Sequence, residues 1–189
     1  MDLLQRLDSR RSTPARQLRE PGPTPQQLDR LLTAAIRVPD HGKLAPWRLL
    51  TIAGDTRAVL GEKLAQIHQR KEPGIADALL VKDRERFTFA PLIVAVIARI
   101  DDHHPKVPAQ EQLLSAGCVA HNLLLGAQAL GFGAQWLTGW AAYDADAAVL
   151  FGLGADERII GFVHIGTPRE TAPERNRPEL AHIVGELRL

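Results

Sequence analysis

The sequence predicts one domain that combines helices and strands, and three observations support this prediction. The chain has 189 residues, which suits a single domain over residues 1–189. Residues 92–100 and 159–165 are apolar runs short enough for buried strands, whereas residues 113–130 are long enough for a buried helix. Helical and strand stretches alternate along the chain, and this alternation by itself favours a doubly wound parallel sheet.

The composition argues against several classes of protein. Hydrophobic residues make up 45% of the chain and charged residues 24%, which are ordinary values for a globular protein. The formal net charge of +1 gives no reason to expect a nucleic-acid partner. No apolar run suggests a membrane-spanning helix, and the first residues lack the pattern of a secretory signal. Cys118 is the only cysteine, which fits a reducing compartment, so we expect a cytoplasmic protein with no membrane partner.

The first residues predict a short helix followed by an anion site. A helix over residues 2–9 would turn three leucines inward, namely Leu3, Leu4 and Leu7. Arg10, Arg11 and Ser12 follow at its end, and two guanidiniums beside a hydroxyl match the oxygens of a phosphate. The alternative is a solvated basic helix end, which the helix dipole also favours.

Thr24, Pro25 and Gln27 mark the start of the next helix. Thr is a favoured N-cap, Pro fits the first helical position, and Gln completes a capping box. This helix is expected to end near Arg37. Its core face would hold Leu28, Leu31, Leu32, Ala35 and Ile36.

Residues 39–47 form a loop in which polar side chains are close together between two prolines. Asp40, His41 and Lys43 lie here, and His41 could bind a cofactor, bind a metal or cap the turn. A metal is disfavoured because no second histidine lies nearby at ligand spacing, and the adjacent His103-His104 pair cannot chelate as i,i+4 helix ligands do. A lone loop histidine is also commonly a surface residue.

The following residues predict a strand, a helix, a polar segment and a second strand. Residues 48–53 predict the first strand, and Asp55 is expected to cap a helix with Val59, Leu60, Leu64 and Ile67 on one face. Residues 68–90 are polar and mixed, which indicates a mobile segment or a weak helix. Residues 92–100 are apolar except for Arg99, so this strand is expected to be central and covered on both faces.

The stretch from Leu113 to Trp140 is the one around which the rest of the chain is organised. Its helix, expected to begin near Ala109, is apolar nearly all round and so should lie inside a domain or an interface. Cys118 belongs to this helix and is expected to be inert core packing.

Glycines are expected to end this helix and to shape the strand that follows. Gly131 and Gly133 stop the helix, residues 132–138 predict the strand, and Gly139 allows a close approach of the backbone. A strand that ends beside a buried helix is a reasonable place for a flat ligand.

The last part of the chain predicts one more helix, one more core strand and a basic tail. Asp144 caps a helix that stops at Gly152, and residues 159–165 form the last strand. Arg175 and Arg177 lie two positions apart, so an extended chain places both on one face, which suits a phosphate. Scattered surface arginines in a solvated tail are the alternative.

Several familiar catalytic motifs are absent from the sequence. There is no G-x-S-x-G elbow, no P-loop and no G-x-G-x-x-G motif, and no carboxylate pair stands out for acid–base work. We therefore expect a cofactor to carry the chemistry, with no catalytic side chain and no metal.

Taken in order, these motifs resemble the nitroreductase-like family of FMN-dependent oxidoreductases, and above all its compact bacterial NAD(P)H nitroreductases. Residues 10–12 match its N-terminal Arg-Arg-Ser motif, and residues 37–47 match a helix end followed by a loop that closes in Pro-Trp. Residues 131–139 match the third block of the family, and residues 159–168 match its last strand and exit. The ordered set covers nearly the whole chain.

The resemblance implies an α+β fold in which helices flank a mixed central sheet, in place of the parallel sheet that alternation favours. It also implies a homodimer with FMN at the subunit interface and NAD(P)H as co-substrate. The implied cofactor-binding residues are Arg10, Arg11, Ser12, Arg37, Asp40, His41, Lys43, Trp136, Leu137, Thr138, Gly139, Arg175 and Arg177.

The resemblance also implies which part of FMN each of these residues contacts. Residues 10–12 hold the phosphate and ribityl end, and residues 175–177 complete the phosphate site. Arg37 also reaches the cofactor, while residues 40–43 come from the partner subunit. Residues 136–138 line the isoalloxazine, with backbone N–H groups near its N5.

Three positions depart from the pattern of the family. Many members have Asn where this chain has Lys43 and Gln where it has Ala45, and compact relatives often have Arg where this chain has Leu137. A lost guanidinium at this last position would weaken one contact to the flavin or alter the choice of substrate.

The function implied is transfer of hydride from a nicotinamide to FMN and then to a small-molecule acceptor such as a nitroaromatic or a quinone, by a ping-pong mechanism. Other readings stay open at this point. One is an enone reductase, dehalogenase or dehydrogenase on the same scaffold. The others are a flavin-binding or storage protein without turnover, and a structural dimer that has lost its cofactor.

Overall fold

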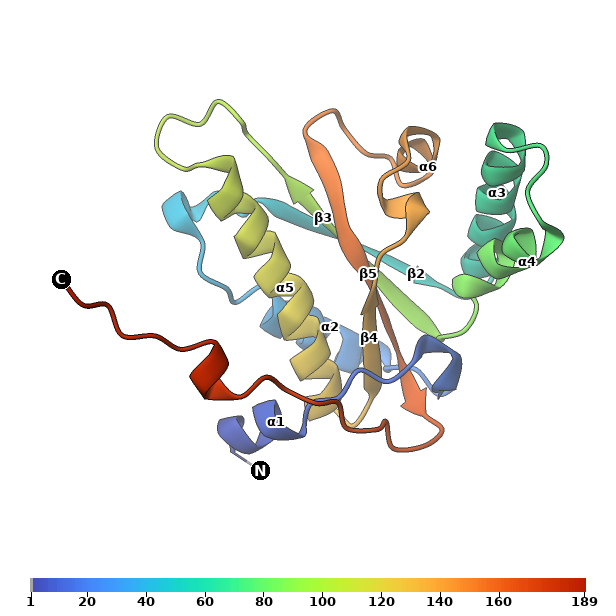
Figure 1. The fold of residues 1–189 in the computed structure, drawn as a ribbon. Helices are drawn as coiled ribbons and strands as arrows, with labels where there is room; N and C mark the ends of the chain where they lie inside the picture. Colours follow the sequence, from blue (N-terminus) through green and yellow to red (C-terminus); the bar gives the residue numbers. More distant parts are fainter. Residues whose placement is uncertain (1) are drawn as a thin grey trace.

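The computed structural model describes residues 2–189 and centres on a five-stranded sheet (Figure 1). The strands are β1 (Leu18–Arg19), β2 (Trp47–Ala53), β3 (Leu92–Arg99), β4 (Gly133–Leu137) and β5 (Glu157–Pro168). Their order is β1-β5-β3-β2, with β4 also paired to β5. Helices and strands therefore combine as the α+β class predicts, and this prediction is confirmed.

The strand directions differ from both expectations. Each of the four pairings between described strands is antiparallel, so neither the parallel sheet nor mixed directions are observed. Alternation of helix and strand does not determine direction. Ala53, the last residue of β2, pairs with Leu92, the first residue of β3. The connection between the two strands therefore begins and ends at the same end of the strands, which makes them antiparallel.

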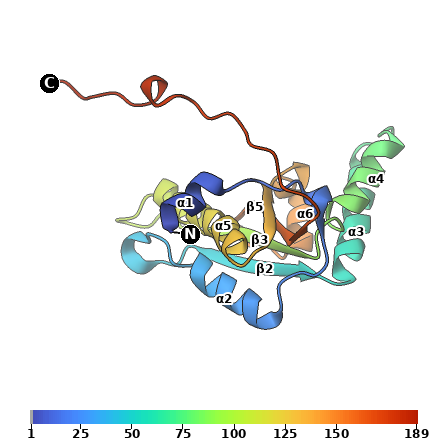
Figure 2. The ribbon, with the colours of Figure 1, turned by 90° about the horizontal axis from the view of Figure 1, so that it is seen from below.

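Helices cover both faces of the sheet. One face packs against α2 (Pro25–Ala35) and α5 (Ala109–Ala129), and its core includes Val94, Val119 and Leu123. The other face packs against α3 (Thr56–Lys71) and α6 (Ala145–Leu150), and Figure 2 shows α3 and α4 on the far side of the strands from α5. Strand β3 is buried from Leu92 to Ala98, which confirms its expected central position.

The predicted start of α2 is confirmed in detail. The Thr24 side chain accepts a hydrogen bond of 3.2 Å from the backbone N–H of Gln27, and the Gln27 side chain accepts one of 2.9 Å from the N–H of Thr24. Leu31 and Ala35 are fully buried, whereas Ile36 is 44% exposed and does not belong to the core.

The helix α1 (Leu3–Ser9) forms where expected, but its leucines are not buried. Leu3 and Leu4 are 67% and 72% exposed, and Leu7 is also exposed. The expected inward orientation is therefore wrong within one chain. An amphipathic pattern identifies an apolar face but does not say which surface covers it.

Residues 68–90 are more ordered than the sequence predicts. Helix α3 continues to Lys71, and α4 (Asp77–Arg86) packs against it, so of the two alternatives the helix is confirmed and the mobile segment is wrong. A Cβ at Gly61 would lie 2.2 Å from the carbonyl oxygen of Arg84, so glycine permits this close helix contact. Few apolar residues mark this contact, which explains why periodicity missed it. On α3, Val59 is exposed, and Asp55 precedes the helix without a side-chain cap.

Helix α5 begins at Ala109 as predicted, but only one of its faces is buried in a single chain. Val119, Ala120, Leu123 and Ala127 are fully covered, whereas Leu114 is 60% exposed. Cys118 also lies on the exposed face, so its expected core position is wrong in the single chain. The composition of α5 indicates that the helix is covered on all sides, but composition does not separate a domain core from an interface.

The last elements follow the prediction closely and lead into a long arm. Asp144 caps α6 by accepting bonds from the backbone N–H groups of Asp146 and Ala147, both at 2.9 Å, although Val149 is exposed. Strand β5 begins at Glu157, slightly before the predicted start. Residues 169–189 then form an arm whose first part contacts the N-terminal segment, with the N–H of Arg169 donating to the carbonyl of Gln17 at 2.8 Å, and whose end extends away from the body of the protein (Figures 1 and 2). Within residues 2–189, no helix is both long and apolar enough to cross a membrane.

Candidate functional site

A groove of about 430 Å³ lies between the N-terminal segment, α5 and β4. It is lined by Arg10, Ser12, His121, Leu124, Trp136 and Thr138. Two predicted motifs, separated by more than a hundred positions in the sequence, therefore meet in one concave surface. The groove is basic at the end formed by the N-terminal segment and aromatic along the strand.

Backbone contacts with β4 hold the N-terminal segment in place. The N–H of Thr13 donates to the carbonyl of Ala134 at 3.0 Å, and the N–H of Ala15 donates to the side chain of Gln135 at 2.6 Å. At the groove, the guanidinium of Arg10 donates to the hydroxyl of Ser12 at 3.4 Å. The strand thus positions the two side chains that the sequence proposes as phosphate ligands.

Four arginines gather at the basic end, and we call Arg10, Arg11, Arg175 and Arg177 the arginine cluster. Burial lowers the pKa of Arg10, and the neighbouring guanidiniums of Arg177, Arg11 and Arg175 lower it further. The C-terminal arm supplies the second pair, so the structure brings the two predicted basic motifs together.

One carboxylate partly balances the arginine cluster. Glu174 pairs with Arg11 and lies 3.5 Å from Arg177, and the guanidinium of Arg177 also donates to the carbonyl of Arg175 at 2.6 Å. Four positive groups face one negative group, so positive charge remains in excess. This excess favours an anionic ligand with several oxygens, such as a phosphate.

The aromatic side of the groove is fixed by β5. The indole N–H of Trp136 donates to the carbonyl of Ile160 at 3.2 Å. A Cβ at Gly161 would lie 2.0 Å from that indole nitrogen, so the ring can adopt this position only beside glycine. Leu137 pairs with Phe162 in the sheet but does not line the groove.

Sequence reasoning missed Arg86, which holds the turn after β4. The guanidinium of Arg86 donates to the carbonyl of Thr138 at 2.7 Å. Gly139 has φ of 145°, and a Cβ there would lie 2.6 Å from both terminal nitrogens of Arg86. The predicted close backbone approach at Gly139 is therefore real, and a guanidinium makes it. Arg86 lies in the mixed segment, where no motif distinguished it.

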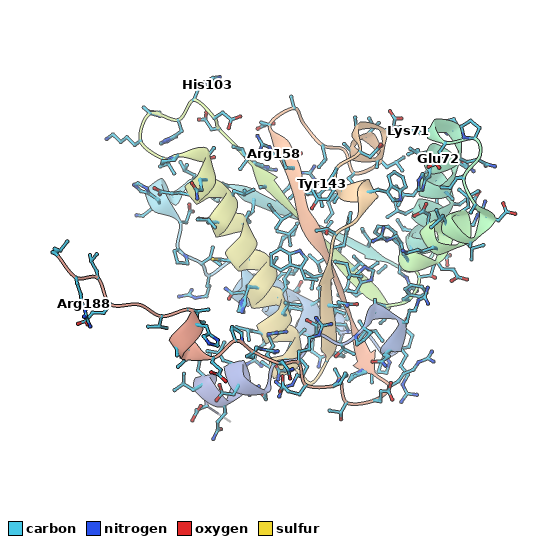
Figure 3. The ribbon with its side chains drawn as sticks, viewed as in Figure 1. Lys71, Glu72, His103, Tyr143, Arg158 and Arg188 are labelled. Carbon is cyan, nitrogen blue, oxygen red and sulfur yellow. The ribbon has the colours of Figure 1, made fainter. Side chains whose placement is uncertain are left out.

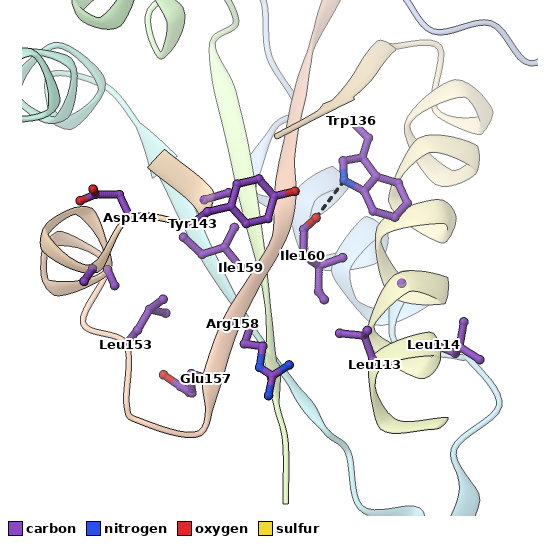
Figure 4. A pocket seen from close by; sticks show the side chains of 14 residues that line it. Leu113, Leu114, Trp136, Tyr143, Asp144, Leu153, Glu157, Arg158, Ile159 and Ile160 are labelled. Carbon is purple, nitrogen blue, oxygen red and sulfur yellow. Dashed lines mark hydrogen bonds between the residues drawn. The ribbon is translucent and has the colours of Figure 1, made fainter. Parts of the chain in front are cut away.

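A second, larger cavity of about 660 Å³ also borders Trp136 (Figure 4). Most of its lining is apolar, from α5, α6 and the start of β5, and Tyr143 and Arg158 are among its polar residues. Trp136 lines both the groove and this pocket. A flat molecule in the groove would therefore have an apolar chamber beside it.

The polar loop of residues 40–43 lies elsewhere, at the first turn of α5. The Asp40 carboxylate accepts from the N–H groups of Leu44 at 3.1 Å and Ala45 at 2.8 Å, and His41 contacts Glu111 at 2.7 Å. Figure 1 shows this loop at the start of α5 and α1 near its end. None of Asp40, His41 and Lys43 lines the groove of the same chain.

Arg37 and the strained part of this loop complete the predicted set. The side chain of Asn122 donates to the carbonyl of Arg37 at 3.2 Å, while Arg37 itself is exposed outside the groove. Lys43 and Ala45 have positive φ values of 56° and 46°, a strained conformation for residues other than glycine. The contribution of this loop to a partner's groove stays a prediction.

The described residues contain no group of three histidine, cysteine or acidic side chains arranged to hold a metal ion. His103 lies at the tip of the loop that precedes α5, well away from the elements around the groove (Figure 3).

Comparison with known proteins agrees with this arrangement of fold and groove. Residues 7–167 match the model of the family described as "Nitroreductase family". The chain belongs to the nitroreductase family. The match includes Arg10 to Ser12 and the sheet up to, but not including, the last residue of β5, and it ends before the C-terminal arm.

One curated relative and two solved structures show how far the similarity extends. The "Putative NAD(P)H nitroreductase YdjA" of Escherichia coli K12 is 37% identical over 169 residues, which cover 89% of this chain and 90% of that protein. A nitroreductase-like family protein from Bacillus cereus superposes with a TM-score of 0.82 at 21% identity and covers 99% of this chain and 96% of its own. The FMN-dependent nitroreductase NfnB from Mycobacterium smegmatis, solved in complex with NADPH, has a TM-score of 0.77 at 18% identity and covers 99% and 100%.

Proposed function

We propose that the protein is an FMN-dependent NAD(P)H oxidoreductase, carried by one domain over residues 1–189 and located in the cytoplasm. One observation supports this most: a groove that has excess guanidinium charge at one end is lined by Trp136 and Thr138 at the other. FMN has the matching shape, a phosphate dianion joined to a flat ring. The names of YdjA and NfnB, in a family of oxidoreductases, point to the same chemistry.

The residues of the groove fit the two ends of FMN. The arginine cluster and Ser12 would bind the phosphate, which would relieve the repulsion that lowers the pKa of Arg10. Trp136 to Gly139 would lie along the ring. Bound FMN would supply hydride acceptance from a nicotinamide and electron transfer to a second substrate. The chain's own part is to bind, orient and cover the ring.

We propose further that the site is completed in a homodimer. The exposed face of α5 and the extended arm of residues 169–189 both leave apolar side chains uncovered, including Leu114 and Leu187. A helix of 21 residues spans about 30 Å, so residues 40–43 lie far from the arginine cluster of their own chain. In a twofold dimer, Arg37, Asp40, His41 and Lys43 of one subunit would approach the groove of the other.

The second cavity suits the acceptor. It is mostly apolar and shares Trp136 with the groove, so a nitroaromatic or a quinone would be accommodated there beside the flavin ring. Because nicotinamide and acceptor would approach the same face of the flavin ring in turn, we expect ping-pong kinetics. Double-reciprocal plots at several acceptor concentrations should give parallel lines.

The decisive experiment is purification followed by identification of the released chromophore. We expect a yellow protein that releases FMN rather than FAD on denaturation, because the groove has one phosphate cluster and no adenine motif. NAD(P)H should bleach the bound flavin, which separates an enzyme from a storage protein. A stopped-flow screen of acceptors on the reduced protein would then identify the acceptor class. A colourless protein that FMN cannot reconstitute would overturn the proposal.

The shared site can be tested by mixing two inactive variants. Arg10→Ala and a His41 variant that is defective by itself should form heterodimers with one intact composite site. Each heterodimer should recover up to about half of its normal site count, by the symmetry of a twofold interface. Heterodimers that form but recover no activity would place both motifs in one subunit's site. A monomer that binds FMN stoichiometrically would refute the shared site directly.

A further inference from the structure

We propose that Asp83 is a positioning residue and that α3 and α4 act through it to fix the segment of residues 138–146. This segment lines both cavities, because Thr138 faces the groove and Ala142 to Ala145 face the acceptor pocket. The proposal rests on the proposed function for its kinetic consequences, but the structural claim stands apart from any cofactor.

Asp83 makes two hydrogen bonds from a buried position. It is 3% exposed, and one carboxylate oxygen accepts from the indole N–H of Trp140 at 2.8 Å. The other oxygen lies 2.6 Å from Nδ1 of His68 on α3, and the rings of His68 and Trp140 lie 4.7 Å apart. A buried carboxylate costs free energy unless it is well bonded, so both bonds constrain the geometry of Trp140.

Arg86 acts on the same segment from the next turn of α4. It lies three residues after Asp83, so the two side chains share one face of the helix. Its bond to the carbonyl of Thr138 fixes the backbone whose other side borders the groove. Burial lowers the pKa of Arg86, and the charge of Asp83 opposes this, so the two groups support one another.

A separate contact fixes the far end of the segment. Lys71, the last residue of α3, lies 2.5 Å from the carboxylate of Asp144 and 3.1 Å from that of Asp146. Figure 3 shows Lys71 near α6, and Tyr143 of the same segment lines the acceptor pocket (Figure 4). The helix pair therefore holds the segment at the groove end through Asp83 and at the pocket end through Lys71.

The two contacts predict different defects. Loss of the Asp83 bonds would free Trp140 and, with it, the backbone of Thr138 and Gly139. Flavin affinity and turnover should therefore both decrease. Loss of the Lys71 contact frees only Tyr143 and Asp144, so the acceptor KM should change while flavin affinity is retained. A helix pair that served only general stability would not separate these two quantities.

The experiment compares four variants in the full-length protein, with FMN and a quinone as probes. Asp83→Leu removes both acceptors, and we expect FMN affinity to fall about tenfold, the loss typical of a bond to a charged group. Asp83→Asn can still accept from Trp140 and donate to a neutral His68, so affinity should stay within about twofold of the original. Lys71→Met should raise the quinone KM about two- to fivefold, as for an exposed ion pair, with unchanged FMN affinity.

Glu62→Ala serves as the matched control. Glu62 pairs with Arg84 at 2.8 Å on the outside of the same helix pair, and it contacts no residue of 138–146. We expect FMN affinity and quinone KM to be unaffected in this variant. If Asp83→Leu does not fold, Trp140→Phe removes only the indole donor and should show the same tenfold loss. The double variant Asp83→Leu/Trp140→Phe should be no worse than either single one.

Hydrogen–deuterium exchange of peptides from residues 138–146, measured without FMN, separates this proposal from the proposed function. Faster exchange in Asp83→Leu or Trp140→Phe, but not in Glu62→Ala, is expected whether or not flavin binds. Unchanged exchange would overturn the positioning role even if the protein is a flavoenzyme. Asp83→Asn failing as badly as Asp83→Leu would also overturn it, because hydrogen bonding would not be what holds the segment.

Discussion

Two groups of arginines in this protein look alike in sequence but differ in their charge balance. Arg48 and Arg99 share the carboxylate of Glu157, which Arg48 contacts through two nitrogens at 2.6 and 2.7 Å. Among the described residues, Glu174 is the one carboxylate that forms ion pairs with the arginine cluster at residues 10–11 and 175–177. Hydrogen bonding to Glu157 raises the pKa of Arg48, whereas burial and neighbouring guanidiniums lower that of Arg10.

The difference in charge balance indicates a different role for each group of arginines. The group around Glu157, with two guanidiniums to one carboxylate, is closer to charge balance and is hydrogen-bonded within the chain, where its side chains stabilise the start of β5 against β2. An unbalanced, partly buried cluster lowers stability until an anion binds, so it is better explained by a ligand than by folding. Substitutions in the two groups should therefore affect different measurements.

Glu157→Ala should give the largest effect, a loss of about 3 kcal/mol in the free energy of unfolding. The Glu157 side chain is only 9% exposed and its partners lower its pKa from 4.5 to about 2, at about 1.36 kcal/mol per pKa unit. The substitution also leaves Arg48 without its acceptor. Urea denaturation measures the loss, and Glu62→Ala, at an exposed pair, should leave the free energy of unfolding almost unchanged.

The same pair predicts the acid sensitivity of the protein. Because the folded pKa of Glu157 is depressed, its contribution is present above pH 4.5 and is lost as the pH falls toward about 2. His164 affects stability at higher pH, because burial lowers its pKa from 6.5 to about 4. The unfolded chain therefore binds a proton on this histidine before the folded chain does, which destabilises the fold as the pH falls from 6.5 toward 4. Stability should therefore decline from pH 6.5 downward, and Glu157→Ala should show a shallower decline below pH 4.5 than the original protein.

Arg10→Ala should have the next largest effect, on ligand binding rather than on folding. We expect FMN affinity to weaken by about 1.5–3 kcal/mol, the range for a hydrogen bond to a charged group. The free energy of unfolding should stay the same or rise slightly, because one repelling charge is removed. Arg30→Ala, at an exposed position on α2, is the control. Unchanged FMN affinity would place Arg10 among ordinary surface arginines.

The sequence predicted the fold best where a local signal decides the structure. The capping box at Thr24, the apolar run of β3 and the Asp144 cap each depend on neighbouring residues, and each is confirmed. The predicted strand directions were wrong because direction depends on which ends of the strands each connection joins. Cys118 and the leucines of α1 were misplaced because burial depends on surfaces that a pattern does not identify.

The candidate site was predicted unevenly for similar reasons. Residues 10–12, 136–138 and 175–177 belong to recognisable motifs, and the structure brings Arg10, Trp136 and Arg177 into one neighbourhood. Asp83 and Arg86 lie in a charged helix without a motif, where exposure is the default expectation. Their importance depends on contacts with Thr138 and Trp140, more than fifty positions away in the chain.

Arg11→Ala gives the smallest effect and tests whether charge balance, rather than the mere presence of arginine, explains the comparison. Arg11 lies beside Arg10, but Glu174 already neutralises it. Its removal should weaken FMN affinity by only about 0.2–1 kcal/mol, the range for exposed ion pairs. Glu174→Gln should have the opposite sign and tighten FMN binding, because the cluster loses its one balancing carboxylate. Titrations at low and high salt would measure both changes, which should shrink together as salt screens the charges. If Arg11→Ala weakens binding as much as Arg10→Ala, pairing with Glu174 does not distinguish the two arginines. The difference in charge balance between the two groups of arginines would then not explain FMN affinity in this groove.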